Sequence, residues 1–212
     1  MITITTKTTT ESAWDKIREM PLAIGTEITD TLKDGTPITF EVAALDIYGA
    51  KKVLVCKDCL PEEHVMNKRL TNKGGWKASD MRKHMKDVLE LLPDDLKAAI
   101  VPRTIKQKLD GEVVECEDLL WLLSSTEVAG AGSWCSDSDV DDQHFPLYQT
   151  EKSRVKECAH HGTWWWWLRS PYATNATHFS YVYTSGNANS TTTSRPTRLA
   201  WPSASCFNHK IV

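Results

Sequence analysis

Four consecutive tryptophans, Trp164 to Trp167, constrain the fold more than any other feature of this sequence. In a β-strand, successive side chains face opposite sides of the sheet, so the four indoles cannot share one face. We therefore expect some of them to lie in the core, with the indole N–H donating to backbone carbonyls, and others to line a surface. Arg169 follows closely, and because an unpartnered buried guanidinium is costly, we predict a hydrogen-bonded structural role for it.

The next segment, from Tyr172 to Arg198, contains no Asp, Glu or Lys, although 25% of the whole chain is charged. It consists mainly of Thr, Ser, Asn, Ala and Tyr. Such low-complexity composition is typical of disordered linkers. Here, however, the segment lies between the tryptophan run and an apolar stretch at residues 199–202, which favours ordered strands and loops on a rigid body.

We expect a β-hairpin within this charge-poor segment. Residues 178–183 are strand-like, residues 185–187 contain the Ser, Gly and Asn of a turn, and residues 188–193 return as a strand rich in β-branched Thr. Alternation alone does not decide whether Tyr181 and Tyr183 or their neighbours face solvent.

A surface of Tyr, Ser, Asn and Thr with occasional Arg has the chemistry of an antibody paratope, in which Tyr supplies amphipathic area and the small polar residues adapt their hydrogen bonds. The candidate anchors are His178, Tyr181, Tyr183 and Arg195. The segment offers no carboxylate pair, no Ser-His-Asp arrangement and no glycine-rich phosphate loop. We therefore predict binding, and no catalytic residues.

Length and charge set wider limits. A chain of 212 residues with 41% apolar residues is a soluble globular protein of one sizeable domain or two small ones. The formal net charge of -3 does not suggest the clustered Lys and Arg that nucleic acid requires, so we expect no nucleic-acid partner. Residues 1–7 hold no apolar signal core and no later run is long enough for a membrane span, so we expect neither standard secretion nor membrane insertion.

The first part of the chain predicts a short helix followed by a small antiparallel sheet. Residues 1–10 form a polar tail, and Ser12 is placed to cap a helix at residues 13–20 that Pro21 ends. The expected strands are residues 26–28, 36–42 and 52–56, with a turn at Asp34-Gly35.

Two helices are expected next. Ser79 caps the first, which Pro93 ends, and the second runs from Pro93 to about residue 100. The apolar residues on one face of the first helix are Met81, Met85, Val88, Leu89 and Leu92.

A hairpin and a buried strand complete this region. Asp110-Gly111 is a strong two-residue turn signal between residues 104–109 and 112–116, and the apolar run at residues 119–123 predicts a buried strand. The order of strands, helices and strands indicates an α+β fold with helices covering one side of a sheet.

The six cysteines are expected to be reduced thiols, since the chain has no export signal. Cys56 and Cys59 have the spacing of half a zinc site, but no second half follows, so two ordinary strand cysteines are the favoured interpretation.

Residues 133–148 form a long irregular stretch with four aspartates, which are Asp137, Asp139, Asp141 and Asp142. Alternating carboxylates can bind calcium, but the glycine and closing glutamate of an EF-hand loop are missing, so a solvated acidic loop is favoured. His160 and His161 are expected to face solvent without a third ligand. We predict no metal site and no cofactor.

The block Trp166-Trp167-Leu168-Arg169-Ser170-Pro171 resembles the most specific motif of a bacterial and phage family with the C-type lectin fold. Phe179, Val182, Gly186, Gly75-Trp76 and a strand at residues 121–127 add to the resemblance, which covers about residues 22–207. Members serve as the variable proteins of diversity-generating retroelements. The resemblance implies a C-type lectin fold of antiparallel sheets, two helices and long irregular loops. It also implies that residues 1–21 are a tail with a short helix and that residues 22–212 are one domain.

In such systems, a reverse transcriptase copies a template with errors at adenines, so asparagine codons become codons for Asn, Ser, Thr, Tyr, His, Ala, Arg, Pro and a few others. The resemblance thus accounts for the composition of residues 172–198 and implies that they bind a ligand on a scaffold including Trp166, Trp167 and Arg169. The implied ligand-binding residues are Tyr172, Thr174, Asn175, Thr177, His178, Tyr181, Tyr183, Asn187, Asn189, Ser190, Thr191, Thr192, Ser194, Arg195, Thr197 and Arg198.

The function implied is non-enzymatic recognition of a protein or cell-surface ligand, by a protein made in the cytoplasm and displayed on a phage virion or host surface. Two alternatives remain open. One is a fixed structural or adhesin protein of a virion. The other is an oxidase of the formylglycine-generating type, which shares the broad fold but uses paired cysteines near the chain end, whereas Cys206 is the only cysteine after Cys158 here.

Overall fold

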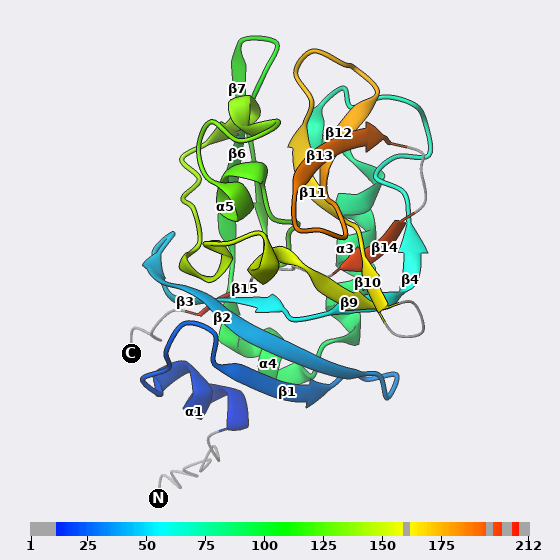
Figure 1. The fold of residues 1–212 in the computed structure, drawn as a ribbon. Coiled ribbons are helices and arrows are strands. Elements are labelled where there is room, and N and C mark those ends of the chain that lie inside the picture. Colours follow the sequence, from blue (N-terminus) through cyan, green and yellow to red (C-terminus); the bar gives the residue numbers. More distant parts are fainter. Residues whose placement is uncertain (1–11, 159–161, 194–196, 201–204, 208–212) are drawn as a thin grey trace, which may run out of the picture.

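The computed structural model describes residues 12–158, 162–193, 197–200 and 205–207 (Figure 1). The predicted polar tail at residues 1–10 and the predicted solvent-facing His160 and His161 lie outside the described residues. None of the helices in the described part of the chain is both long and apolar enough to cross a bilayer.

The predicted N-terminal helix is confirmed as α1, Ala13–Glu19. The Ser12 hydroxyl accepts a hydrogen bond from the Asp15 N–H, and the Asp15 carboxylate accepts one from the Ser12 N–H in return. The buried ring of Trp14 meets Phe40 edge-on at 5.7 Å and fixes the helix against the neighbouring sheet.

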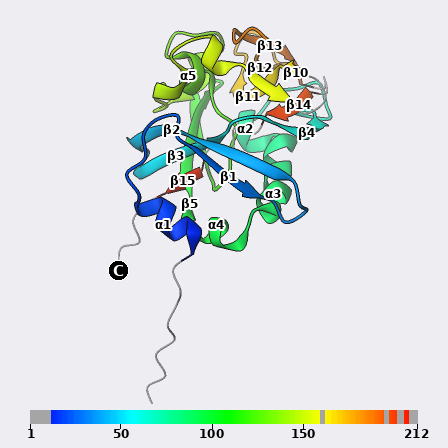
Figure 2. The same ribbon diagram turned by 60° about the horizontal axis from the view of Figure 1, so that its bottom comes forward.

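That sheet has five strands in the order β1-β2-β3-β15-β5 and lies at one end of the molecule, beside α1 (Figures 1 and 2). Its strands are β1 Glu27–Thr31, β2 Pro37–Ile47, β3 Ala50–Cys56, β15 Ser205–Phe207 and β5 Ile100–Val101. The first three confirm the predicted small antiparallel sheet. β15 pairs with both β3 and β5, so residues near the C-terminus complete a sheet begun by the N-terminal strands.

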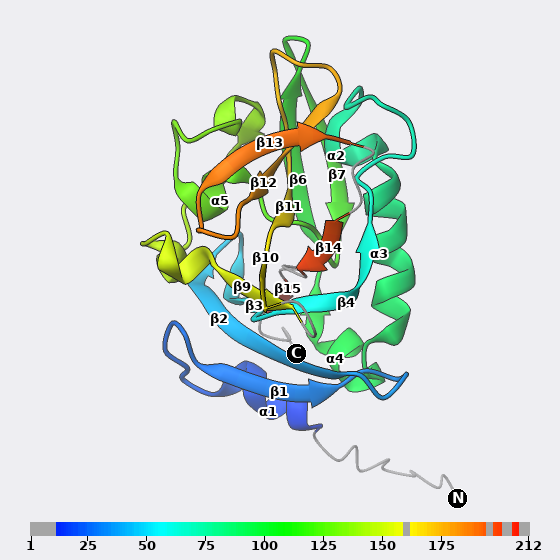
Figure 3. The same cartoon turned by 45° about the vertical axis from the view of Figure 1, so that its right-hand side comes forward.

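The two predicted helices are confirmed as α3, Asp80–Leu91, and α4, Asp94–Ala99. The Ser79 hydroxyl accepts from the Arg82 N–H at the start of α3. The predicted apolar face is confirmed, because Met81, Met85 and Val88 are buried. A single turn, α2 Gly75–Ala78, precedes α3, which runs along one side of the molecule (Figure 3).

The predicted hairpin is confirmed as β6 Arg103–Leu109 and β7 Glu112–Asp118, and β8 Asp139–Val140 pairs with the other edge of β6. The turn residues Asp110 and Gly111 have φ angles of 51° and 88°, as a two-residue turn that follows the strand twist requires.

The strand predicted at residues 119–123, and at residues 121–127 by the resemblance, is wrong. Leu122 and Leu123 are fully buried as expected, but their carbonyls accept hydrogen bonds from the guanidinium and the backbone N–H of Arg169. Ser124 then caps a short helix, α5 Ser125–Ala129. The run contains one isolated bridge residue, Trp121, and no strand. A buried apolar run therefore does not by itself identify a strand.

A four-stranded sheet has the order β10-β9-β4-β14. Its strands are β10 Gly162–Trp164, β9 Lys156–Cys158, β4 Cys59–His64 and β14 Thr197–Ala200. Cys59 and Cys158 face each other across the parallel pair β4 and β9, with 4.8 Å between their Cα atoms, and form a disulfide.

The expectation that all cysteines are reduced is therefore wrong for Cys59 and Cys158. Cys59 is not available to half a zinc site with Cys56, since its sulfur is bonded 99 residues away in sequence, a distance over which spacing gives no signal. Cys116 and Cys135 are free thiols, and the side chain of Cys206 lies outside what the structure describes.

A three-stranded sheet, β11 Trp166–Pro171, β12 His178–Val182 and β13 Ala188–Thr192, confirms the predicted hairpin. Trp166 and Trp167 are fully buried, and their indole N–H groups donate to the carbonyls of Arg154 and His64 at 3.0 and 3.2 Å. This confirms the predicted core role of these two. With its small, mostly antiparallel sheets and few helices, the structure is α+β.

Candidate functional site

The predicted ligand-binding residues lie mainly on the three-stranded sheet and its loops, at the end of the molecule opposite the five-stranded sheet (Figures 1 and 3). We call the solvent-accessible members among residues 172–192 the polar face. Exposed members are Thr174, Tyr183, Asn187 and Asn189, and half-buried members are Tyr172, Asn175, Thr177, His178, Ser190, Thr191 and Thr192.

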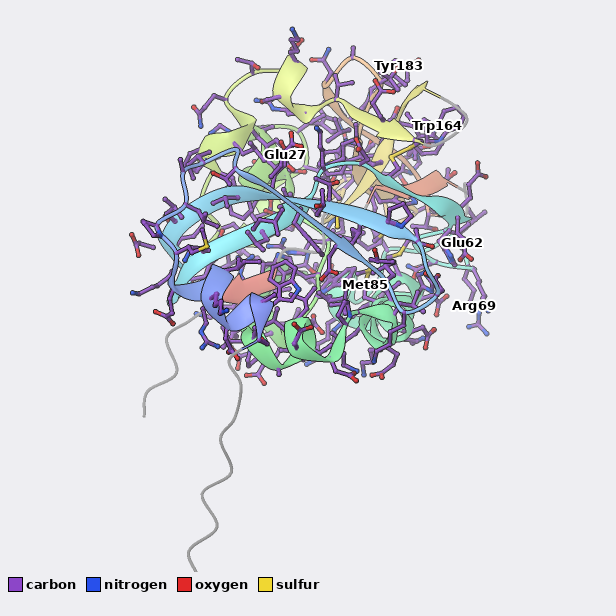
Figure 4. The ribbon with its side chains drawn as sticks, turned by 90° about the horizontal axis from the view of Figure 1, so that it is seen from below. Glu27, Glu62, Arg69, Met85, Trp164 and Tyr183 are labelled. Carbon is purple, nitrogen blue, oxygen red and sulfur yellow. A yellow bond between two sulfur atoms is a disulfide. The ribbon has the colours of Figure 1, made fainter. Side chains whose placement is uncertain are left out.

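The two tyrosines of β12 and the following turn have different environments. Tyr183 is 50% exposed and lies at the periphery of the molecule (Figure 4), whereas Tyr181 is only 8% exposed. The Tyr181 ring meets Trp165 and Trp167 edge-on, at 5.2 and 6.4 Å between centroids. Tyr181 is thus a core residue, and its expected role as a ligand anchor is corrected. The alternation of side chains along the strand could not show that Tyr181 is buried, because β12 is buried on both faces from Phe179 onward.

The remaining predicted residues do not join this sheet. Thr197 and Arg198 lie on β14, where they pair with His64 and Glu63 of β4 in the four-stranded sheet. Their side chains, and the whole of Ser194 and Arg195, lie outside the described residues.

Asn72, which the sequence did not single out, secures the loop at residues 172–178. Its side-chain amide donates to the carbonyls of Tyr172, Asn175 and His178 at 3.1, 3.0 and 2.8 Å, and its backbone N–H donates to Ala176 at 2.7 Å. All these acceptors are backbone atoms about 100 residues away, so no residue pattern could have revealed the contact.

Trp134 was also missed, and it extends the polar face with an aromatic surface. It is 48% exposed, and its ring lies 5.2 Å from that of Tyr172, tilted by 37°. A tryptophan in an irregular stretch was the available signal, but the sequence interpretation of this stretch considered only its aspartates, as a solvated acidic loop.

A closed network of ion pairs lies beneath the polar face. The fully buried Arg169 on β11 donates to Glu127 and to Asp142, both at 2.5 Å, and to the Leu122 carbonyl at 2.9 Å. Arg103 of β6 pairs with the same two carboxylates, so two arginines and two carboxylates alternate in a ring. The structural role predicted for Arg169 is confirmed. Burial raises the pKa of Glu127, but Arg103 and Arg169 outweigh it and lower this pKa to about 2.

The solvated acidic loop predicted at residues 137–142 is wrong for two of its four aspartates. The Asp142 side chain is 1% exposed and belongs to the ion-pair network. Asp139 is half-buried as a residue, but its carboxylate is directed inward and accepts hydrogen bonds from Thr126 and Ser170 at 2.6–3.0 Å. These aspartates are structural because their partners come from distant segments that spacing cannot reveal.

The buried Asp139 predicts a distinctive pH dependence of stability. Burial, the largest cause, together with Asp142 raises the pKa of Asp139 from 3.8 to about 7. Between pH 3.8 and about 7, Asp139 is ionised in the unfolded chain but protonated in the folded protein. The stabilisation that protonated Asp139 gives the folded state is therefore complete below the pKa of the unfolded chain, and it is lost as the pH rises through the pKa of the folded protein. Relative to Asp139→Asn, the wild-type protein should lose up to about 1.4 kcal/mol of unfolding free energy per pH unit in this window.

Urea unfolding at several pH values between about 4.5 and 6.5 measures this difference. Asp137→Asn is the matched control, because Asp137 is exposed on the same loop and should leave the wild-type profile unchanged. Parallel profiles for wild type and Asp139→Asn would contradict the prediction.

A pocket of about 420 Å³ has cations along its wall and lies beside the loop that Asn72 secures; its lining residues are Asn67, Lys68, Arg69, Thr71, Lys73, Ala78, Asp80 and Lys83. We call it the basic pocket. Residues 68–86 carry seven Lys or Arg against one Asp in a chain whose net charge is -3. The expectation that cations are not clustered is therefore wrong for this strip, since net charge averages over the whole surface.

The described residues contain no group of three or more His, Cys, Asp or Glu side chains arranged to hold a metal ion. His64 and His84 come close, with stacked rings 3.6 Å apart, but stacked rings do not direct their nitrogens at one ion.

Comparison with known proteins gives a family but no function. No curated protein matches this sequence, and no solved structure matches it either. One family model, described as a domain of unknown function, matches residues 50–200, a range that includes the ion-pair network, the basic pocket and the polar face. The chain therefore belongs to the DUF6273 family.

Proposed function

We propose that this protein is a non-enzymatic recognition protein with the C-type lectin fold, whose polar face binds a protein or cell-surface ligand and is diversified by retroelement mutagenesis. The observation that carries the proposal is the location of the charge-poor segment. Many of its Tyr, Thr, Ser and Asn residues, which have the chemistry of a paratope, are solvent-accessible on the three-stranded sheet and its loops.

The support beneath this face suits such a role. β11 is buried along its whole length, with Arg169 bound in the ion-pair network and Trp166 and Trp167 in the core. The turn at residues 183–187 is fixed as well, because a Cβ on Gly186 would lie 1.9 Å from the Glu151 carbonyl oxygen. A rigid base allows side chains above it to vary without loss of the fold, and it reduces the entropy lost on binding.

The DNA around the gene tests the diversification. We expect a reverse transcriptase gene and a near-copy of the codons for residues 164–207 that differs only where the copy has adenine. Variants from related isolates should then differ at polar-face positions and not at Trp166, Trp167 or Arg169. If neither element is present and substitutions are spread evenly, the diversification proposal fails, and an inactive descendant or a fixed structural adhesin becomes the favoured interpretation.

Tyr183→Ala tests the binding face itself. Tyr183 is the exposed large aromatic of the hairpin turn, so its loss should weaken ligand binding by about 2 kcal/mol, roughly 30-fold, with the melting temperature unchanged. Ligands would first be found with the wild-type protein on protein and glycan arrays, and affinities measured by surface plasmon resonance.

Val113→Ala is the control for this test, because Val113 is 57% exposed and lies on β7, outside the three-stranded sheet that carries Tyr181 and the hairpin turn. Equal affinity of wild type and Tyr183→Ala for every ligand found would remove Tyr183 from the binding face.

A further inference from the structure

We propose that the basic pocket binds a short acidic segment of the protein partner, next to the contacts made by the polar face. The proposal deepens the proposed function and rests on it for the presence of a partner. It adds the partner's chemistry, namely consecutive Asp or Glu side chains.

The first observation is that three of the four cations lining the pocket are exposed and form no ion pair within the described residues. Lys68, Arg69 and Lys73 are exposed, and Arg69 projects at the edge of the molecule (Figure 4). Lys83 pairs with Asp80 at 2.8 Å, but within the described part of the chain Lys68, Arg69 and Lys73 form no ion pair. These three positive charges are thus free to meet carboxylates from outside.

The second observation is that the loop bearing these cations is braced. The Asn67 side chain is 7% exposed; its amide N–H donates to the Thr71 carbonyl at 2.6 Å and its oxygen accepts from the Asp80 N–H at 2.9 Å. The Asp80 carboxylate in turn accepts from the Lys68 N–H at 3.1 Å. The backbone positions of the cations are therefore set before binding, which lowers the entropy lost when a partner is bound.

The third observation is continuity with the polar face. Thr193, directly after β13, donates from its hydroxyl to the Arg69 carbonyl at 2.9 Å, and its own carbonyl accepts from the Asn67 N–H at 3.1 Å. Asn72 ties the same loop to residues 172–178. A partner seated on the polar face therefore has the basic pocket at its rim, where charge complementarity raises the association rate and excludes unsuitable partners.

The surroundings favour a short acidic peptide over a nucleic acid. A second pocket of about 410 Å³ shares Lys68, Asp80 and Lys83 with the basic pocket, and Asp87 also lines it. Duplex DNA presents a charge about every 1.7 Å and needs a continuous cationic track. The carboxylates of Asp80 and Asp87 interrupt such a track, whereas two or three carboxylates fit beside Lys68, Arg69 and Lys73.

The test uses a fluorescent peptide of about six consecutive glutamates with neutral ends, titrated with the full-length protein at low salt and followed by anisotropy. The triple variant Lys68→Ser, Arg69→Ser, Lys73→Ser should bind it at least about fivefold more weakly. The control triple variant Lys16→Ser, Lys108→Ser, Lys152→Ser removes three exposed lysines elsewhere and has the same net charge. It should bind within about twofold of wild type.

Other arms separate the possible outcomes. A peptide with glutamine in place of glutamate should not bind. The Tyr183→Ala variant should bind the glutamate peptide as wild type does, because Tyr183 does not line the basic pocket. A negative result in the Tyr183→Ala ligand-binding experiment would therefore not affect the peptide test. The single variant Lys73→Glu should weaken binding of the glutamate peptide about threefold. It replaces the triple variant in this test if the triple variant does not fold. Absence of peptide binding, equal loss in both triple variants, or binding of a duplex DNA of matched charge more tightly than the peptide would each overturn the proposal.

Discussion

Replacing Arg169 with Met is expected to lower the free energy of unfolding by about 3–5 kcal/mol, or to prevent folding altogether. Arg169 is fully buried, and its guanidinium contacts Glu127, Asp142 and the Leu122 carbonyl. Met fills similar space but donates no hydrogen bond. Two buried carboxylates would then share Arg103 as their one remaining arginine, so the loss comes from unbalanced buried charge and not from a cavity.

Urea unfolding followed by tryptophan fluorescence measures this loss. Arg69→Met is the matched control, because Arg69 is exposed and its replacement should change stability by no more than about 0.5 kcal/mol. The double variant with Glu127→Gln should be less destabilised than the two single effects predict, since the charge imbalance is partly relieved. A loss below about 1 kcal/mol in Arg169→Met would mean that the network does not stabilise β11.

Tyr181→Ala is expected to cost about 3–5 kcal/mol, as truncation of a buried aromatic ring does. Its ring packs edge-on against Trp165 and Trp167, so its removal leaves a cavity between the tryptophans and the hairpin. Tyr183→Ala, two residues further on, should change stability by no more than about 0.5 kcal/mol, since that ring is 50% exposed. Thermal and urea unfolding of the two variants provide the comparison.

The contrast between the two tyrosines also decides how binding data are interpreted. A loss of ligand binding in Tyr181→Ala would follow from damage to the sheet, whereas the same loss in Tyr183→Ala would report a contact. Equal stability of the two variants would contradict the assignment of Tyr181 to the core.

Local features of this fold could be predicted from the sequence because their causes are local. The caps at Ser12 and Ser79 depend on N–H groups three residues away, and the turn at Asp110-Gly111 depends on residues that tolerate positive φ. Arg169 could be assigned a structural role because a guanidinium next to four tryptophans must find partners somewhere.

The partners themselves could not be predicted. Arg169 meets carboxylates 27 and 42 residues away, Cys59 meets Cys158 at a separation of 99, and Asn72 binds carbonyls more distant still. Each contact depends on how sheets are placed against one another, which no local pattern records. The polar face was found by its composition, but which of its side chains reach solvent depended on β12 being covered on both sides.

The position of β15 has a consequence for how the protein is made. Residues 205–207 pair with both β3 and β5, so the five-stranded sheet remains incomplete until residue 207 has been synthesised. Pairing over such sequence separations is slow, and unpaired strand edges promote aggregation in the meantime. Residues 172–198 leave the ribosome before this closing strand. Under the proposed diversification, a variant of these residues would therefore have to remain compatible with folding before any ligand could select it.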